Sequence, residues 1–365
     1  MRSRWEIWSS DSRGNRLKLS GNGGQFGVGR LLNGIGEWYL NLPSSFDMTL
    51  VPLDNMIEFW RAPENGPLSL FCVGFIKERE RWTRGRRISG PDQNDILQTR
   101  IVAYAAGSTD SEITTNYDDM MKHVIRSNFG TLATDTDRDL SGYNFTIEPD
   151  SAAAPSGTLA FSRENTLDTL IKIADASREA GTELYFDLVP VIQSDQSIGF
   201  NFRTYINQSG QDRTQDASNP TFFGEKYGNM LEAIVIEDAN EEINDVYAGG
   251  QGEEASRTIV QAENLTRIGR SPWNRREGFV NYSNADSTGV LLAAAQAMIT
   301  DKRPRKKFNG AIVDTPQARF GVDWGLGYRV TCDHDGEQFD ALIKQVDLEV
   351  DNENETITAK VEVEQ

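Results

Sequence analysis

The sequence predicts a β-rich α+β fold. Short runs of aromatic and β-branched residues, which suit half-buried strands, recur through the first hundred residues and return after residue 311. Helical periodicity is limited to the middle of the chain and to one stretch near residue 290. A chain of 365 residues exceeds what one core usually serves, so we expect two to three domains.

The first domain, residues 1–110, is predicted to consist of strands. The strand-like runs lie at residues 37–43, 48–53, 56–60, 68–76 and 99–104. Short strands separated by turns, with no helix between them, are typical of a small β-barrel or sandwich.

An α/β domain is predicted at residues 111–225. Its first helix, residues 117–129, ends at Gly130, a candidate left-handed cap. Its second helix, residues 165–180, has Asn165 as a cap and ends at Gly181. The alternating residues 182–191 and 197–206 then indicate a hairpin.

The third domain, residues 226–365, is predicted to be β-rich again. Strands are expected at residues 231–238, 328–332, 339–346 and 356–363. An alanine-rich helix interrupts them at residues 288–302, with Ser287 as its cap and Pro304 beyond its end.

The charge is strongly acidic. Asp and Glu number 55 against 37 Lys and Arg, which gives a formal net charge of −18. Because such a surface repels phosphates, we do not expect it to bind DNA broadly. Acidity of this kind fits either a saline environment, such as a halophilic or marine host, or the lumen of a tube through which DNA slides. No apolar run is long enough to span a membrane, and the first residues lack the apolar region of a secretory signal.

No catalytic or metal-binding pattern is evident. Cys72 and Cys332 are interpreted as buried, reduced thiols, with a long-range disulfide as the alternative. The two histidines are His123, inside a predicted helix, and His334, in a stretch with the spacing of a β-turn. No Gly-x-Ser-x-Gly elbow is present, and 55 carboxylates make acidic pairs uninformative. We therefore expect no enzymatic activity, no cofactor and no metal.

Residues 247–330 carry the motifs that indicate a function. The glycine-rich turn Tyr247-Ala-Gly249-Gly250-Gln-Gly252 precedes Arg257 and is followed by Arg275-Arg276-Glu277-Gly278-Phe279-Val280. After the alanine-rich helix comes Trp324-Gly325-Leu326-Gly327-Tyr328-Arg329-Val330. In this order and spacing the pieces resemble the baseplate-hub, or tail-tip hub, proteins of long-tailed, siphovirus-like phages and archaeal viruses. Relatives tend to have the motif Leu-Gly-Asp-x-Val at this point, whereas this chain has Tyr328 in place of the aspartate. A role of that aspartate in relatives is therefore not inferred for this chain.

The resemblance implies a structural virion protein at the tail tip. Hubs of this kind have two β-barrel-like domains that line the tube, an α/β domain outside, and a trimeric ring that closes the tail tube. The ring would link the distal tail ring to the fibre or spike and let DNA pass during ejection. The implied partners are further copies of the chain, the distal tail and tail-tube proteins, the tape measure, and the fibre or spike. Assembly would take place in the host cytoplasm, and DNA would pass only transiently.

Two other functions stay open. A tail-associated polysaccharide or peptidoglycan hydrolase would need a pocket with paired carboxylates. A carbohydrate- or receptor-binding module would need a solvent-facing aromatic platform, such as one that includes Trp273.

Candidate interface residues stand out against the acidic background. A basic cluster alternates with glutamates around a tryptophan, and it comprises Arg79, Arg81, Trp82, Arg84, Arg86 and Arg87. It is either a solvated hairpin or a face that meets acidic surfaces of neighbouring protomers or of the tail ring. A second cluster, residues 302–307, is interpreted as the cationic end of a helix. Trp5 and Trp8 are candidates for contact with another subunit, with core packing as the alternative.

Overall fold

The computed structural model describes residues 3–17, 24–63, 66–103, 111–161, 163–252, 256–283, 285, 287–351 and 354–364. They group into two compact units. The first comprises Met1–Ala233 and Gly310–Glu362, and the second comprises Ile234–Asn309 and Val363–Gln365. The fold is β-rich α+β, as predicted. The second unit is an insertion within the predicted third domain. The boundaries of the three predicted domains stay a prediction.

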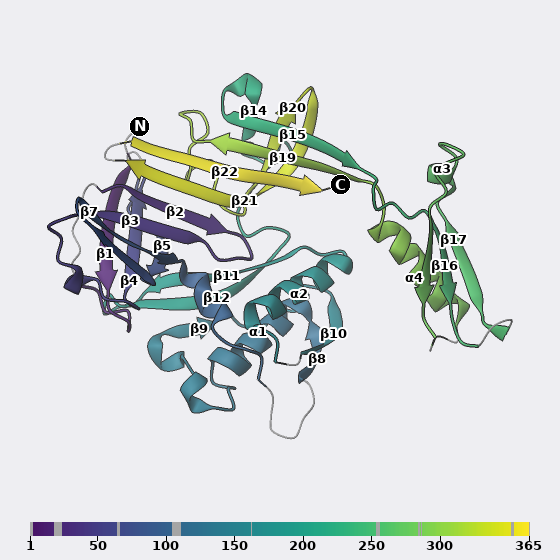
Figure 1. Ribbon diagram of the computed structural model, residues 1–365, viewed down its shortest axis with the longest axis horizontal. Coiled ribbons are helices and arrows are strands. Elements are labelled where there is room, and N and C mark those ends of the chain that lie inside the picture. The colour runs from purple at the N-terminus through teal and green to yellow at the C-terminus, as the bar shows by residue number, and fades with distance from the viewer. Residues whose placement is uncertain are drawn as a thin grey trace. The chain divides into compact units, whose positions relative to one another are not determined.

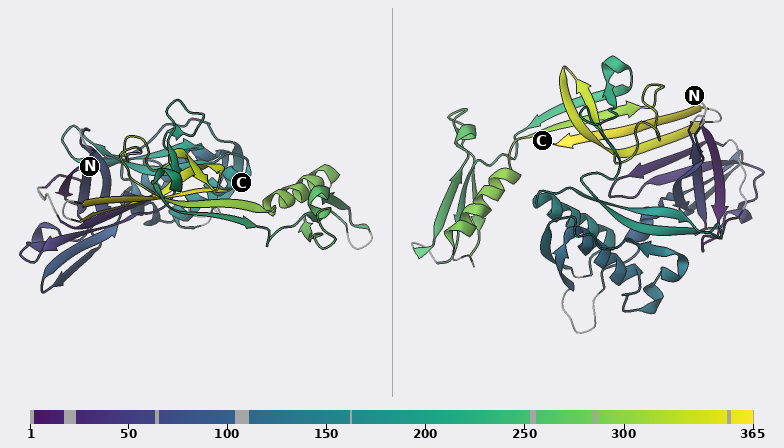
Figure 2. Two further views of the ribbon diagram at one scale, coloured as in Figure 1. Left: turned by 90° about the horizontal axis from the view of Figure 1, so that it is seen from above. Right: turned by 180° about the vertical axis from the view of Figure 1, so that it is seen from behind.

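The largest sheet of the first unit joins the two ends of the chain. Its order is β15-β19-β22-β21-β2-β3-β7-β6, with β20 attached to β21 and with β13 and β14 attached to β20, which makes eleven strands. The N-terminal strands, purple in Figure 1, lie beside the C-terminal strands in yellow, and both views in Figure 2 show the same neighbours. The bounds are β2 (Phe26–Leu31), β3 (Glu37–Pro43), β6 (Glu78–Trp82), β7 (Gly85–Pro91), β13 (Asp212–Arg213), β14 (Phe222–Gly224), β15 (Met230–Asp238), β19 (Arg305–Val313), β20 (Arg329–His334), β21 (Glu337–Asp351) and β22 (Asn354–Glu364).

A second sheet packs its aromatic residues against the first. It is antiparallel, in the order β1 (Arg4–Ser10), β4 (Met56–Ala62) and β5 (Ser69–Phe75). The ring of Phe59 lies 5.6 Å from Phe26 and 5.5 Å from Trp38, centroid to centroid. In the part of the chain that the structure describes, the large sheet has open edges at β15 and β6, so one chain does not form a closed barrel there.

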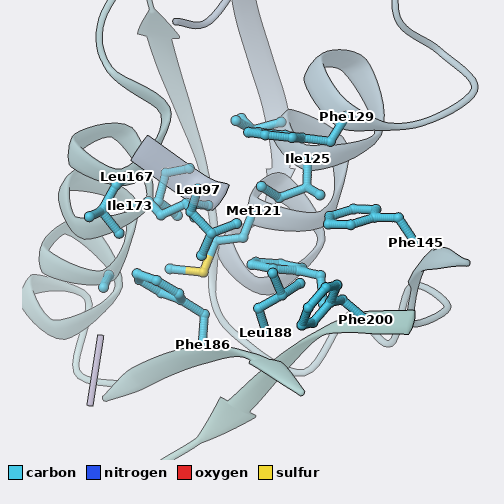
Figure 3. Close-up of a cluster of buried hydrophobic side chains, with 14 of the residues drawn as sticks. Leu97, Met121, Ile125, Phe129, Phe145, Leu167, Ile173, Phe186, Leu188 and Phe200 are labelled. Atoms are coloured by element: carbon cyan, nitrogen blue, oxygen red, sulfur yellow. The ribbon is translucent and has the colours of Figure 1, made fainter. Parts of the chain in front are cut away.

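The α/β region has its own core. It contains β8 (Ser111–Asn116), α1 (Tyr117–Phe129), β9 (Phe145–Ile147), β10 (Ser156–Phe161), α2 (Thr166–Glu179), β11 (Leu184–Ile192) and β12 (Ile198–Ile206). Met121, Ile125 and Ile173 point from the two helices toward Phe186 and Phe200 on the β11–β12 hairpin (Figure 3). The predicted helices and hairpin are confirmed. Asn165 caps α2 by accepting a hydrogen bond from the Leu167 amide, and Gly181 adopts a left-handed φ of +89°.

Several local predictions are wrong. Residues 48–53 do not form a strand, because Asp47 caps a 3-10 turn, η1 (Met48–Leu50). Residues 99–103 make only an isolated bridge at Ile101, and residue 104 lies outside the described residues. Gly130 is extended, with φ −121°, and not left-handed. The other 3-10 turns are η2 (Gln93–Gln98), η3 (Thr136–Arg138), η4 (Ser141–Tyr143) and η5 (Glu225–Tyr227).

The second unit is a small sheet covered by one helix. Strand β16 (Asp245–Gly249) lies between β17 (Ile259–Glu263), which is antiparallel to it, and β18 (Glu277–Asn281), which is parallel. The predicted helix α4 (Thr288–Asp301) packs on this sheet through Leu291 and Ala295. Ser287 occupies its N-cap position but makes no side-chain cap hydrogen bond. A short helix, α3 (Leu265–Ile268), follows β17.

Candidate functional site

The first basic cluster forms the hairpin of β6 and β7. The strands pair from Glu78 and Ser89 at the base to Trp82 and Gly85 at the tip. Strand β6 is an edge of the large sheet, so one side of it has no neighbouring strand among the described residues. The indole of Trp82 lies over Gly85, where a Cβ would come within 2.6 Å of the ring, yet 45% of Trp82 remains exposed.

The arginines of this hairpin divide into two groups. The side chain of Arg79 donates to the Met48 carbonyl, and Arg86 donates to the carbonyls of Trp82 and Gly85 at 3.0 Å. The guanidinium of Arg87 stacks 4.1 Å from the ring centroid of Tyr39. Arg81 and Arg84 are exposed at the tip, and neither forms an ion pair or hydrogen bond with a described residue.

A groove of about 1070 Å³ lies on the outward face of the same sheet. Its floor is β2, where Gly27 and Gly29 alternate with the buried Val28. Tyr39 on β3 and Glu349 on β21 stand opposite Gly27. A Cβ on Gly27 would lie 2.6 Å from the Tyr39 ring and 2.7 Å from the Glu349 carboxylate. Because Gly27 has no Cβ, the side chains of Tyr39 and Glu349 pack directly over β2 and form part of the surface of the groove.

Carboxylates dominate the charge of the groove. Five of them line it, namely Glu37, Glu78, Asp95, Asp347 and Glu349. The partners that the structure describes for them are neutral: Tyr39 donates to Glu349, Gln345 to Asp347 at 2.9 Å, and Ser89 to Glu78 at 3.2 Å. Burial and the hydrogen bond to Glu349 raise the pKa of Tyr39 to about 12. The phenol therefore stays a neutral donor at physiological pH.

Two of the three cations of the groove pair with acids outside it. The Arg30 guanidinium pairs with Asp187 at 2.8 Å. Lys77 pairs with Asp54 at 2.9 Å, and Arg87 stacks on Tyr39. The groove therefore presents an excess of negative charge on an open sheet face.

Trp5 and Trp8 have different environments. Trp5 is buried, with 8% of its surface exposed, and its Nε1 donates to Glu355 at 2.8 Å. Trp8 is half-buried, and the guanidinium of Arg16 lies 5.1 Å from its ring centroid. Trp5 thus contributes to the core of the first unit, and Trp8 lies at its margin.

The motif residues of the stretch 247–330 have structural roles. Arg257 donates to the carbonyls of Gly249 at 3.1 Å and Gly250 at 3.2 Å, which fastens the glycine-rich turn. Trp324 is fully buried and donates to the Ala318 carbonyl at 2.9 Å. Gly327 has φ +74°, and a Cβ there would lie 1.8 Å from the Ser209 hydroxyl. The glycine of this motif is therefore required by its backbone conformation and by the close approach of Ser209.

The second basic cluster pairs with nearby acids. Lys302 lies 3.0 Å from Glu241, and Lys306 lies 3.5 Å from Glu237. Arg303 donates to the Thr300 carbonyl at 2.8 Å just beyond the end of α4, as expected for a cation at a helix terminus. Residues 305–307 instead lie on strand β19.

The described cysteines and histidines, which are the candidate catalytic or metal-binding residues, do not lie together in one site. Cys72 and Cys332 are both buried and free, which excludes the disulfide alternative in this structure. His123 lies on α1, and His334 lies 3.7 Å from Asp335 at the end of β20. Among the described residues, no group of three or more His, Cys, Asp or Glu side chains is placed to hold a metal. No described helix is both long and apolar enough to cross a bilayer.

Sequence reasoning missed the groove. Its carboxylates come from β3, β6, β21 and the 3-10 turn η2, and no local pattern reveals that these elements lie together. The available signal was the alternation of Gly27 and Gly29 within a strand, which commonly marks a close approach of another chain or ligand.

The fold is that of phage tail proteins. The 43 kDa tail protein of prophage MuSo2 from Shewanella oneidensis is similar over 98% of both chains, with 10% identity and a TM-score of 0.54. A tail protein of Neisseria meningitidis MC58 is similar over 98% of this chain and 96% of its own, with 12% identity and a TM-score of 0.53. A chain of the lidded PdpA–VgrG complex of Francisella matches 99% of this chain and 52% of its own, with 11% identity and a TM-score of 0.51.

The family follows from the sequence. The chain belongs to the Siphovirus ReqiPepy6 Gp37-like protein family, whose model matches residues 5–361. No curated protein matches it by sequence. The resemblance to tail proteins of long-tailed phages is thereby confirmed.

Proposed function

We propose that this protein is a structural component of the virion tail tip, a baseplate hub that acts without covalent chemistry. Three copies form a ring that closes the tail tube, docks on the distal tail ring and carries the fibre or spike. The observation that carries the proposal is the likeness to a prophage tail protein over 98% of both chains, because it spans both units and not one shared module.

The surface of α4 supports assembly into a larger particle. The helix has no charged residue between Thr288 and Thr300, yet only Leu291 and Ala295 are buried. Val290 is 50% exposed and Leu292 is 37% exposed. A helix that is apolar around its whole circumference is usually buried, so we infer that another subunit covers α4 in the particle.

The open edges of the large sheet and the negative net charge of the chain both support the proposal that the ring lines a channel. Among the described residues the large sheet ends at edges without a neighbouring strand, so we infer that the barrel-like tube domains are completed between copies. The net charge of −18 gives such a tube a wall that repels phosphate, which lets DNA pass without binding.

Antibody labelling of intact virions tests the proposal. Gold-labelled antibodies against this protein should mark one site per particle, at the tail tip distal to the capsid. Label on the tail shaft or the capsid, or its absence from purified infectious particles, would contradict a hub.

The hydrolase alternative would depend on the acidic groove. Asp347 and Glu349 lie two residues apart on one face of β21, so their side chains are separated by about 7 Å. That distance is within the range for inverting glycosidases. We expect no release of soluble sugar or peptide from peptidoglycan. Hydrolysis by the wild type that Glu349→Gln abolishes would favour the enzyme.

The receptor-binding alternative would depend on Trp273, which is 90% exposed. A sugar platform usually combines several aromatic faces, and no ring–ring contact of Trp273 is found among the described residues. Binding of host polysaccharide that Trp273→Ala removes would support this alternative.

A further inference from the structure

We propose that the tip of the β6–β7 hairpin of one copy docks into the acidic groove of a second copy of this chain. The inference rests on the proposed ring and names a contact that holds its neighbours together. The docking elements are Arg81, Trp82 and Arg84 on one side and the glycine-floored groove on the other.

The charges of the two surfaces are complementary. The groove carries five carboxylates, and none of them forms an ion pair with a described residue. The hairpin tip carries two exposed guanidinium groups, those of Arg81 and Arg84, which also have no described partner. Guanidinium groups bind carboxylates through two parallel hydrogen bonds, so this contact would satisfy both sets of groups. In a protein with a net charge of −18, such a contact also offsets repulsion between copies.

The shape of the groove favours a chain segment over a small ligand. Its volume of about 1070 Å³ lies at the upper end for small-molecule pockets, which are also mostly apolar. Here five carboxylates line the groove, and the Tyr39 ring and the Glu349 carboxylate lie directly over Gly27.

The hairpin cannot fill the groove of its own chain. Its base, at Glu78 and Ser89, already lines the groove. The tip lies four residues farther along β6, about 13 Å from the base. The connection at the tip is only Thr83 and Arg84, which is too short to fold back. The groove and the tip are different surfaces, so the contact is head-to-tail and closes into a ring when the rotation between copies allows.

Crosslinking between two differently labelled variants tests the contact. Thr83→Cys places a thiol at the tip, and Glu37→Cys places one at the rim of the groove; both positions are exposed. The native thiols, Cys72 and Cys332, are buried. The two full-length variants are mixed, allowed to exchange and treated with a short bismaleimide. We expect a product that contains one copy of each variant.

Two matched variants make the test specific. Glu179→Cys, on the exposed end of α2, replaces Glu37→Cys as a control and should give at least about tenfold less product. Adding R81E and R84E to Thr83→Cys should reduce the Glu37→Cys product by at least about tenfold at low salt. Mass measurement on the same samples reports the oligomeric state.

The outcomes separate this inference from the hub itself. A ring-sized oligomer that gives no tip-to-groove product, or as much product with Glu179→Cys, overturns the docking and leaves the hub intact. A monomer at every concentration overturns both. Product formation that R81E and R84E leave unchanged overturns the role of the arginines.

Discussion

Arg30 donates through Nη2 to both carboxylate oxygens of Asp187, at 2.8 and 2.9 Å. Arg30 lies on β2 and Asp187 on β11, so the pair joins the large sheet to the hairpin of the α/β region. The Nε of Arg30 also lies 3.1 Å from Asp92. Asn33 and Asn94 add side-chain hydrogen bonds to the backbone of β11. The two regions are therefore held together by polar groups at fixed positions.

Replacing Arg30 should destabilise the first unit strongly. Above about pH 8, where Asp92 is ionised, Arg30→Met leaves this fully buried carboxylate without a counter-charge, and we expect the free energy of unfolding to fall by about 3–5 kcal/mol. Urea titration followed by tryptophan fluorescence measures the change. Arg178→Met, which removes an exposed pair with Asp175, is the matched control and should cost at most about 1 kcal/mol. Equal losses in the two variants would contradict the structural role of Arg30.

The stability should depend on pH through Asp92. Burial raises the pKa of Asp92 from 3.8 to about 7, against the attraction of Arg30. The folded state then holds a proton that the unfolded state releases, so this contribution is full below pH 3.8 and is lost as the pH rises through about 7. Asp92→Asn removes the titration. The stability of the wild type relative to this variant should therefore fall between about pH 4 and about pH 7 in urea titrations and stay level above that range. A constant difference would show that Asp92 titrates normally.

Replacing Gly74 should destabilise the protein, because the Trp38 side chain packs directly against this glycine. A Cβ on Gly74 would lie 1.9 Å from Nε1 of Trp38, whose ring is buried and held by a hydrogen bond to the Pro91 carbonyl at 3.0 Å. Gly74→Ala should lower the free energy of unfolding by about 1–3 kcal/mol. At Gly142 a Cβ meets nothing within 4 Å, so Gly142→Ala should stay within about 0.5 kcal/mol of the wild type. Indistinguishable unfolding midpoints would contradict the contact.

The two thiols should be unreactive in the folded protein. Burial raises the pKa of both Cys72 and Cys332, so neither is a thiolate at neutral pH. A chromogenic thiol reagent should label neither cysteine in buffer and both in urea. Rapid labelling of one site in buffer, assigned by mass spectrometry of peptides, would show that the site opens locally.

Local features of the fold could be predicted from the sequence. Helix α2 was predictable because its apolar stripe and its Asn165 cap lie within one short segment. The prediction of a strand at residues 48–53 was wrong. The apolar residues of this run suit a strand, but Asp47 caps a 3-10 turn there.

Long-range features could not be predicted in the same way. Strands β2 and β21 pair although Gly27 and Glu349 are far apart in sequence, and no alternation of residues specifies that partner. The groove depends on this pairing, and the alternation of Gly27 and Gly29 is the one local feature of the sequence that relates to it. The basic hairpin was identified as a candidate interface because its charge pattern is local.

The most direct test of the hub is the mass and image of the assembled protein. Native mass measurement and electron microscopy of the full chain, at high concentration and in concentrated salt, should give three times the mass of one chain and a ring with a wide central hole. A stable monomer under these conditions, or a compact oligomer without a hole, would contradict the account.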